Sequence, residues 1–430
     1  MTTIPVTQSQ LSIKESARTS RPEIELLLCC ARTQIDPMTV ERIKVLLQQD
    51  IDWTYLIQTS ACHGVMPLLY RSVNATCPEA VTKSILSQLR NFFHTNAQRN
   101  LLLTQELLKL LNLFKENEIP AIPFKGAVLA ASAYGNLSLR QFSDLDILVH
   151  RKDVEKAKQV FLSQGYNMKI ERIEVTEEQK AAFVRSQSIH KLVREAAYPF
   201  IHPETELVVE LHWRIMPDYF SFPIDSEALW HNLEPVTIAG QSVPNLSPEN
   251  TLLMLAGHGT KDCWTNLARI CDVAELIRSY PQLNWCKLME QASIKGGQRI
   301  LFLALTLARN ILGTALPDEV WQKIQTDPKV SLLAVEVNQN LFQSNEGSSQ
   351  DGKVTHFHLS VRERLQDKIL YFLRLATTPT TSDWLVLPLV EFPAFVYYLL
   401  RPIRLVGGQL LKKLTRIHDF FYSNIEQQYP

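Results

Sequence analysis

The most constraining feature of this sequence is the run from Pro123 to Val149, which reads PFKGAVLAASAYGNLSLRQFSDLDILV. Ile119 to Phe124 is short and apolar, and Lys125-Gly126 then precedes an alanine-rich stretch that favours a helix. A polar loop over 135–143 leads to Asp144 to His150, whose β-branched apolar residues predict a strand. Such a strand, helix and strand unit predicts an α+β fold.

Asp144 and Asp146 are the first candidate functional residues. They are separated by one residue of a predicted strand, so their side chains share a face and lie about 6 to 7 Å apart along it. Two carboxylates at this spacing suit one hard cation, or two Mg²⁺ ions that share an oxygen ligand. Such a site needs a third carboxylate from a neighbouring strand.

Glu210 is the candidate for that third carboxylate. It lies in ETELVVELHW, and residues Glu206 to Trp213 are apolar enough to form another strand. An acid in such a run is either a metal ligand or a residue on a solvated sheet face. His212 would share the face of Glu210, where it either contacts an acceptor molecule or serves a structural purpose.

Basic residues occur at both ends of the alanine-rich helix. Gly126 would let a ligand approach the backbone, and the amides at a helix N-terminus attract phosphate. Lys125 would add a positive charge for a phosphate, although glycine at a strand exit is commonly only a turn. Arg140 either neutralises phosphate or pairs with Asp144.

The rest of the chain is predicted to be mainly helical around a small sheet. Further strands are expected at Asn167 to Ile173 and Ile189 to Arg194, with helices at Val154 to Gln164 and Glu177 to Arg185. Ser247-Pro248-Glu249 is a typical helix start. The expected organisation is a disordered terminus over 1–20, a helical domain over 21–115, a small mixed β-sheet core with helices over 116–225, a helical domain over 226–345, a polar loop over 346–355 and a C-terminal helical segment over 356–430.

Overall composition excludes several classes of protein. The 44 basic and 44 acidic residues balance, so no global field favours stable nucleic-acid binding. The sequence contains neither a G-x-x-x-x-G-K-[ST] loop nor a strand-linked G-x-G-x-x-G. The seven cysteines include no C-x-x-C pair, and the first 20 residues have no apolar signal core. These features predict a cytoplasmic protein with reduced thiols.

One apolar segment bears on membrane contact. Trp384 to Leu400 reads WLVLPLVEFPAFVYYLL, and it contains Glu391 and two prolines. It falls short of the roughly 20 clean apolar residues that a span requires. We therefore expect no membrane span, with residues 384–404 forming either a packed helical hairpin or an interfacial helix.

Ionisable residues in the later part of the chain suggest further candidate sites. His258 and Asp262 have the i, i+4 spacing of metal ligands, but the glycines on both sides of His258 argue against a regular helix there. Asp272 follows Arg269 by three residues, which predicts an ion pair within one helix. The doublet His418-Asp419 suggests an HD-type metal phosphohydrolase as a minor alternative.

Taken in order, these motifs resemble the nucleotidyltransferase superfamily that includes DNA polymerase β-like enzymes. More closely, the chain resembles a bacterial family of uncharacterised nucleotidyltransferases, although Glu210 stands where the wider superfamily usually has aspartate. The resemblance rests on these pieces: Lys125-Gly126, Arg140, Asp144 to Val149, Glu210 to Trp213, and His258 with Arg269 and Asp272.

The resemblance implies an enzyme that transfers a nucleoside monophosphate from an NTP such as ATP to a hydroxyl group. Asp144, Asp146 and Glu210 would be catalytic and would hold two Mg²⁺ or Mn²⁺ ions. The nucleotide and its phosphates would be bound by Lys125, Gly126, Arg140, His258 and Asp272. The acceptor, whether small molecule, protein or RNA, is left open, and a catalytically silent binding or adaptor module of the same fold is the main alternative.

Overall fold

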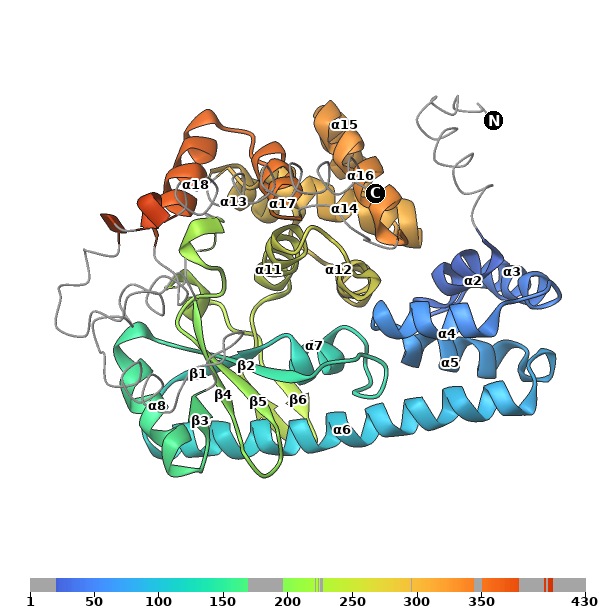
Figure 1. Ribbon diagram of the computed structural model, residues 1–430, viewed down its shortest axis with the longest axis horizontal. Helices are drawn as coiled ribbons and strands as arrows, with labels where there is room; N and C mark the ends of the chain where they lie inside the picture. Colours follow the sequence, from blue (N-terminus) through green and yellow to red (C-terminus); the bar gives the residue numbers. More distant parts are fainter. Residues whose placement is uncertain are drawn as a thin grey trace, which may run out of the picture.

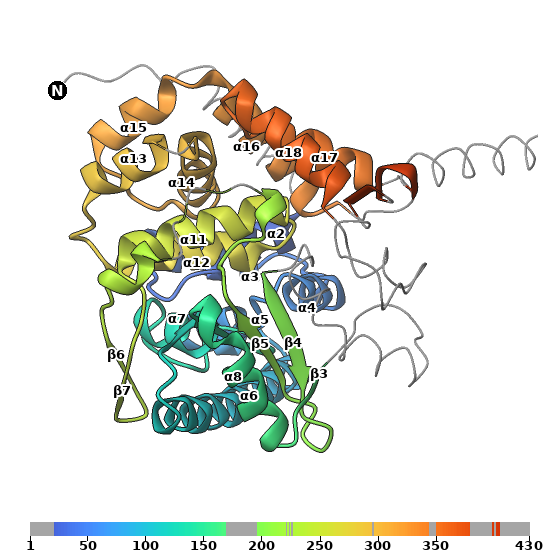
Figure 2. The ribbon, with the colours of Figure 1, turned by 90° about the vertical axis from the view of Figure 1, so that its left-hand side faces the viewer.

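The computed structural model describes residues 21–168, 196–343 without 221, 223, 225, 226 and 295, then 350–378, 398–399 and 401–404. Its helices surround one five-stranded sheet and one two-stranded sheet (Figures 1 and 2). The predicted α+β fold, with a small mixed sheet flanked by helical regions, is confirmed.

Helices form the first hundred described residues, as predicted for 21–115. Pro67 lies in the first turn of α5 and Pro78 begins a short 3-10 helix, so both prolines mark breaks. The last helix of this region, α6, is long and connects the N-terminal helices to the sheet (Figure 1). The bounds are α2 (Pro22–Cys30), α3 (Pro37–Leu47), α4 (Trp53–Cys62), α5 (Met66–Thr76) and α6 (Lys83–Glu116).

The central sheet has the strand order β1-β2-β5-β4-β3. Strands β2 and β5 are parallel neighbours, and the other neighbouring pairs are antiparallel. The predicted helices after Lys125 and after Asp153 are both present. The bounds are β1 (Ala121–Phe124), α7 (Gly126–Ser132), β2 (Asp144–Val149), α8 (Val154–Ser163), β3 (Asn167–Met168), β4 (Ala197–Ile201) and β5 (Val208–His212).

Strand β4 was not predicted, because Pro199 at its centre argues against a strand. In the structure, Pro199 lies opposite Glu210 of β5, and the residues on both sides of it also pair with β5. The helix expected at 177–185 and the strand expected at 189–194 lie outside the described residues, as does most of the predicted strand at 167–173.

The sheet separates two buried clusters. One face packs on α6 and α8 through residues such as Leu107, Phe161 and Leu211. The other face contributes Ile122 and Leu148 to a larger cluster shared with the helices before and after the sheet. Figure 1 shows α6 beneath the sheet and the later helices above it.

The chain then forms a hairpin and a helical region. Strands β6 (Val236–Ile238) and β7 (Gln241–Val243) pair across Ala239-Gly240, whose positive φ angles of 47° and 80° suit a tight hairpin turn. This hairpin was not predicted. The helices that follow confirm the predicted helical region: α11 (Pro248–Lys261), α12 (Leu267–Ser279), α13 (Trp285–Ile294), α14 (Gln298–Leu312), α15 (Asp318–Gln325) and α16 (Pro328–Leu341).

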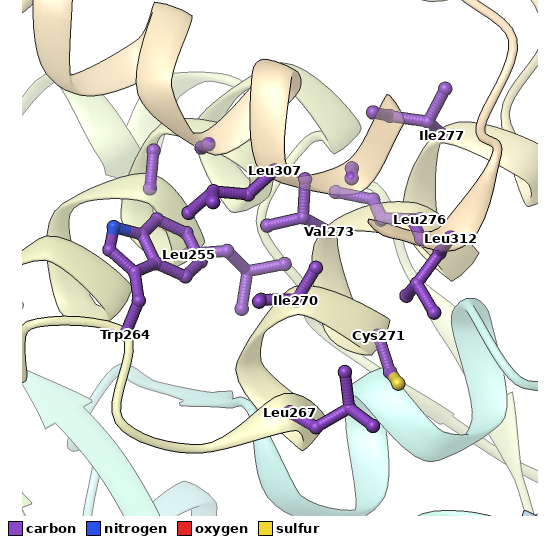
Figure 3. Close-up of a cluster of buried hydrophobic side chains, with 14 of the residues drawn as sticks. Leu255, Trp264, Leu267, Ile270, Cys271, Val273, Leu276, Ile277, Leu307 and Leu312 are labelled. Carbon is purple, nitrogen blue, oxygen red and sulfur yellow. The ribbon is translucent and has the colours of Figure 1, made fainter. Parts of the chain in front are cut away.

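Helix α11 corrects one prediction and confirms another. The Ser247 hydroxyl accepts from the Asn250 amide, as expected for a helix cap. The prediction that glycines would prevent a regular helix around His258 was wrong, since α11 continues through both flanking glycines. They serve packing, because a Cβ at Gly257 would lie 2.9 Å from the Phe222 ring and one at Gly259 would lie 2.4 Å from the Trp264 ring. Figure 3 shows the apolar side chains around Trp264.

Two further helices follow, α17 (Gln350–Ser360) and α18 (Leu365–Thr377). The polar loop predicted for 346–355 was partly wrong, because α17 begins at Gln350. Burial of Phe357 and His358 explains this, since packing of one face can hold a helix whose sequence is otherwise polar. Within the described residues, the structure has no helix that is both long and apolar enough to span a membrane. Most of 384–404, and His418-Asp419, lie outside those residues.

Candidate functional site

The register between β2 and β5 brings the predicted acids together. Asp146 lies directly opposite Glu210, and each strand places a second polar residue two positions away on the same face, Asp144 on β2 and His212 on β5. The alternate residues of both strands are apolar and belong to the cluster on α6 and α8. One sheet face therefore carries four polar side chains from two adjacent strands.

His212 joins the two carboxylates. Its Nε2 lies 2.9 Å from Oδ1 of Asp146 and 3.1 Å from Oε2 of Glu210. Lys125 Nζ lies 3.5 Å from the same Asp146 oxygen. Asp146 and His212 are both buried, whereas the Glu210 side chain remains 36% exposed. The cluster is thus open to solvent on the side of Glu210.

Lys125 and His212 favour the ionised forms of Asp146 and Glu210. Burial disfavours the charged form of Asp146, but Lys125 and His212 outweigh it and hold the pKa of Asp146 well below its usual range. The hydrogen bond with His212 also lowers the pKa of Glu210. Burial opposes charge on His212, yet its bonds to both acids raise its pKa. Each of these shifts favours the charged form of its group.

Asp144 behaves differently. Burial is the main cause that raises its pKa to about 6, and the charge of Asp146 adds to the shift. Ionisation of Asp144 is therefore less favourable than that of an exposed aspartate, although the charges of Lys125 and Arg140 partly favour it. Asp146, Glu210 and His212 offer ligand atoms that all lie within 4.8 Å of one another. A carboxylate-rich donor set of this kind fits a divalent cation.

The Lys125-Gly126 turn has an unusual backbone. Lys125 has φ 56° and ψ −136°, and Gly126 has φ 36°. A non-glycine residue in this conformation costs about 1 to 3 kcal/mol, and such residues cluster at functional sites. A Cβ on Gly126 would lie 3.6 Å from the Asp144 carbonyl oxygen, so the turn passes close to the start of β2. The predicted strand, Lys-Gly and helix arrangement is confirmed.

One interpretation of the sequence pairs Arg140 with Asp144, but the structure pairs Arg140 with Asp272. Its Nε and Nη2 each donate to a carboxylate oxygen of Asp272 at 2.8 Å, and the Tyr134 hydroxyl donates to the same carboxylate at 2.7 Å. Burial opposes its charge, but Asp272 raises the pKa of Arg140 further above its usual value. A bidentate ion pair of this kind fixes both partners.

The helical ion pair predicted between Asp272 and Arg269 was also wrong. Arg269 pairs with Asp262 instead, because Asp272 lies on the inner face of α12, where it meets the loop before β2. Arg140 in the loop and Asp272 on α12, both predicted from the sequence as site residues, therefore contact each other. Arg140 and Asp272 connect the segment that leads into β2 with the helical region above the sheet.

His258 is buried on α11, and its Nε2 lies 3.0 Å from the Ile215 carbonyl oxygen. Burial lowers the pKa of His258 well below its usual value, and the charge of Lys125 adds to this. The i, i+4 partner considered for a metal, Asp262, pairs with Arg269. The contacts of His258 therefore position the segment after β5 relative to α11.

Sequence reasoning weighed His212 mainly as a structural residue. The signal that would have identified it is the two-residue spacing from Glu210, which repeats the spacing of Asp144 and Asp146 on the neighbouring strand. Pairing of the two strands then makes all four residues neighbours.

The mixed sheet, the paired acids and the turn before α7 agree with the nucleotidyltransferase class that the sequence motifs resemble. A family model described as uncharacterised nucleotidyltransferase matches residues 49–313, so the chain belongs to that family. The match includes the sheet, the acid cluster and α11 to α14. A search of curated proteins and a search of solved structures found no match.

Proposed function

We propose that this protein is a metal-dependent nucleotidyltransferase that transfers a nucleoside monophosphate from an NTP to a hydroxyl group of an acceptor. The observation that carries the proposal is the parallel register that sets Asp146 beside Glu210, with Asp144 on the same face. Family membership independently supports nucleotidyl transfer.

Three carboxylates are proposed as the catalytic metal ligands. Asp144 and Asp146 would hold one Mg²⁺ or Mn²⁺ ion, and Asp146 with Glu210 would hold a second. Ions held by these residues would supply positive charge to the triphosphate and would lower the pKa of the acceptor hydroxyl. The raised pKa of Asp144 supports this assignment, because the carboxylate lies where a cation would relieve its repulsion from Asp146.

Lys125 and Gly126 are proposed to contact the triphosphate. Lys125 already lies close to Asp146, so its ammonium group can offset the charge that develops on the leaving pyrophosphate. In the reaction, the acceptor oxygen forms a bond to the α-phosphorus while the bond from that phosphorus to pyrophosphate breaks. The hydroxyl proton is released to solvent. Gly126 allows the turn to pass beside Asp144.

Arg140, Asp272 and His258 are proposed to support nucleotide binding by positioning the site. The Arg140 charge is matched by Asp272, and His258 faces a backbone carbonyl. Nε and Nη2 of Arg140 and Nε2 of His258 are thus engaged within the protein, which favours a positioning role over direct contact with phosphate. The acceptor is proposed to be a small molecule, a protein or an RNA, since the balanced charge of the chain favours none of them.

A transfer assay tests the proposal. Purified protein is incubated with Mg²⁺ or Mn²⁺, each α-³²P-labelled NTP and a cell lysate separated into protein, RNA and small-molecule fractions. We expect label to move into one fraction, and Asp146→Asn to abolish the transfer. Glu41→Gln, which changes an exposed acid on α3 in the same way, is expected to transfer normally.

Two results would count against the proposal. If no label moves and metal with nucleotide leaves the melting temperature unchanged, the chain is a catalytically silent member of the fold. If label moves equally well with Asp146→Asn, transfer occurs at another site. The minor HD-type alternative involves His418-Asp419, which lies outside the described residues.

A further inference from the structure

His212 occupies a position that a simple structural role does not explain. It is 5% exposed and lies on the sheet face of the three carboxylates, two residues after Glu210. The Phe124 ring meets the imidazole edge to face, with 4.9 Å between centroids. Packing and both ring nitrogens therefore fix the orientation of the side chain, with Nε2 directed at two acids.

The hydrogen bond of the second ring nitrogen, Nδ1, determines whether Nε2 of neutral His212 carries a hydrogen or a lone pair. Nδ1 of His212 lies 3.3 Å from the carbonyl oxygen of Arg214, and a carbonyl oxygen can only accept a hydrogen bond. Nδ1 must therefore carry a hydrogen. In the neutral imidazole the lone pair is then on Nε2, where it faces Asp146 and Glu210. Lys125 contacts the Asp146 oxygen. A lone pair on Nε2 at hydrogen-bond distance from two carboxylate oxygens calls in addition for a proton or a metal ion between them.

The spacing of these atoms suits a metal. Ligands bound at about 2.1 Å and at right angles to one another are separated by about 3.0 Å. Nε2 lies 2.9 Å from the Asp146 oxygen and 3.1 Å from the Glu210 oxygen. Metal-bound histidines also generally donate their other ring N–H to a backbone carbonyl or carboxylate, as His212 can to Arg214.

We propose that Nε2 of His212 is a metal ligand together with Asp146 and Glu210, and that this nitrogen makes the site prefer a first-row transition ion such as Mn²⁺ over Mg²⁺. Mg²⁺ favours an all-oxygen shell, whereas imidazole nitrogen stabilises the transition ions. The inference rests on the proposed function. The inference extends the proposed function by assigning a fourth residue, His212, and a class of cation to the same site.

Metal binding without nucleotide tests the inference directly. Mn²⁺ is titrated into the full chain and free Mn²⁺ is followed by electron paramagnetic resonance, with Mg²⁺ as competitor. Pulsed resonance of the bound Mn²⁺ then detects nitrogen in its first shell, and protein labelled with ¹⁵N-histidine assigns that nitrogen to histidine. We expect a histidine coupling in the wild type and its loss in both His212→Gln and Asp146→Asn.

Affinity provides a second measurement. Loss of the imidazole is expected to weaken Mn²⁺ binding by about 10- to 100-fold, a range seen when groups that support metal ligands are removed. Mg²⁺ affinity should change much less, because oxygen ligands remain. His94→Gln is the matched control, since His94 lies on an exposed part of α6. It should retain both the coupling and the affinity.

The outcomes separate this inference from the proposed function. Mn²⁺ bound through Asp146 without a histidine coupling would overturn the inference, and label transfer supported by Mg²⁺ would still uphold the enzyme. Absence of any Mn²⁺ binding would overturn the inference and also remove the metal basis of the proposed reaction. If His212→Gln fails to fold, the ¹⁵N-histidine experiment on the wild type still decides the question.

Discussion

Asp144 and Asp146 are two residues apart on one strand, yet their pKa values move in opposite directions. The difference arises from their neighbours. Asp146 receives Lys125 and His212, whereas Asp144 is buried beside a like charge. The negative charge of the proposed cation site thus opposes ionisation of Asp144 in the absence of a cation.

Asp144→Asn should make the metal-free protein more stable at pH 8. The folded pKa of Asp144 is raised, so the native state binds more protons than the unfolded state between about pH 4 and pH 6. Its contribution to stability is therefore present below pH 4 and is lost as the pH rises through 6. The variant should gain about 1 to 3 kcal/mol at pH 8 and nothing near pH 3.5.

Urea unfolding in EDTA across this pH range measures the gain, with the exposed Glu41→Gln variant as control. The same Asp144→Asn variant should lose the stabilisation that Mn²⁺ gives the wild type. An equal or lower free energy of unfolding for Asp144→Asn at pH 8 would contradict the raised pKa.

The buried pair of Arg140 and Asp272 should be sensitive to removal of one partner. Asp272→Ala leaves a buried guanidinium uncompensated and removes the acceptor of the Tyr134 hydroxyl. Breaking such a pair typically lowers the free energy of unfolding by about 3 to 5 kcal/mol. The double variant Arg140→Met with Asp272→Leu should be less destabilised than Asp272→Ala alone.

Chemical denaturation of the single and double variants measures this coupling. Glu25→Ala breaks the more exposed pair with Arg42 and should cause a clearly smaller loss. If Asp272→Ala lowers the free energy of unfolding no more than that control does, the buried pair contributes no more to stability than an exposed pair.

Among the secondary-structure elements, local patterns predicted β2 and β5 because each has a period of two or a continuous apolar run. They could not predict that Asp146 pairs with Glu210, since the register depends on packing of both faces. Strand β4 was missed because a proline at the centre of a short segment argues against a strand when only the local sequence is considered. The partner of Arg140 lies 132 residues away, so no local pattern indicates it.

Helix α11 gives a prediction about close packing. Alanine normally favours a helix over glycine by about 1 kcal/mol. At Gly259, however, the added Cβ would lie 2.4 Å from the Trp264 ring, so Gly259→Ala should lower the free energy of unfolding by about 1 to 3 kcal/mol. Urea unfolding measures the change. In a Trp264→Leu background the same substitution should be much less harmful, and equal effects in both backgrounds would refute the packing argument.

Described residues that are far apart in the sequence share one buried core. Leu26 of α2 and Leu301 of α14 belong to one buried cluster, and the Cys271 thiol lies 3.5 Å from the Ala31 carbonyl oxygen. Helices before the sheet therefore pack directly on helices after it. This arrangement supports the site, because α12 carries Asp272 and also contacts α7.

The last prediction concerns cooperativity between these two sets of helices. Leu26→Ala removes a fully buried side chain and should destabilise the fold by about 2 to 5 kcal/mol. Because the core is shared, amide hydrogen exchange should accelerate in α12 and α14 as well as in α2. Leu332→Ala on α16 is the control, since Leu332 is exposed and its loss should leave exchange unchanged. Acceleration confined to α2 to α5 would mean that the N-terminal helices unfold alone and that the acid cluster does not depend on them.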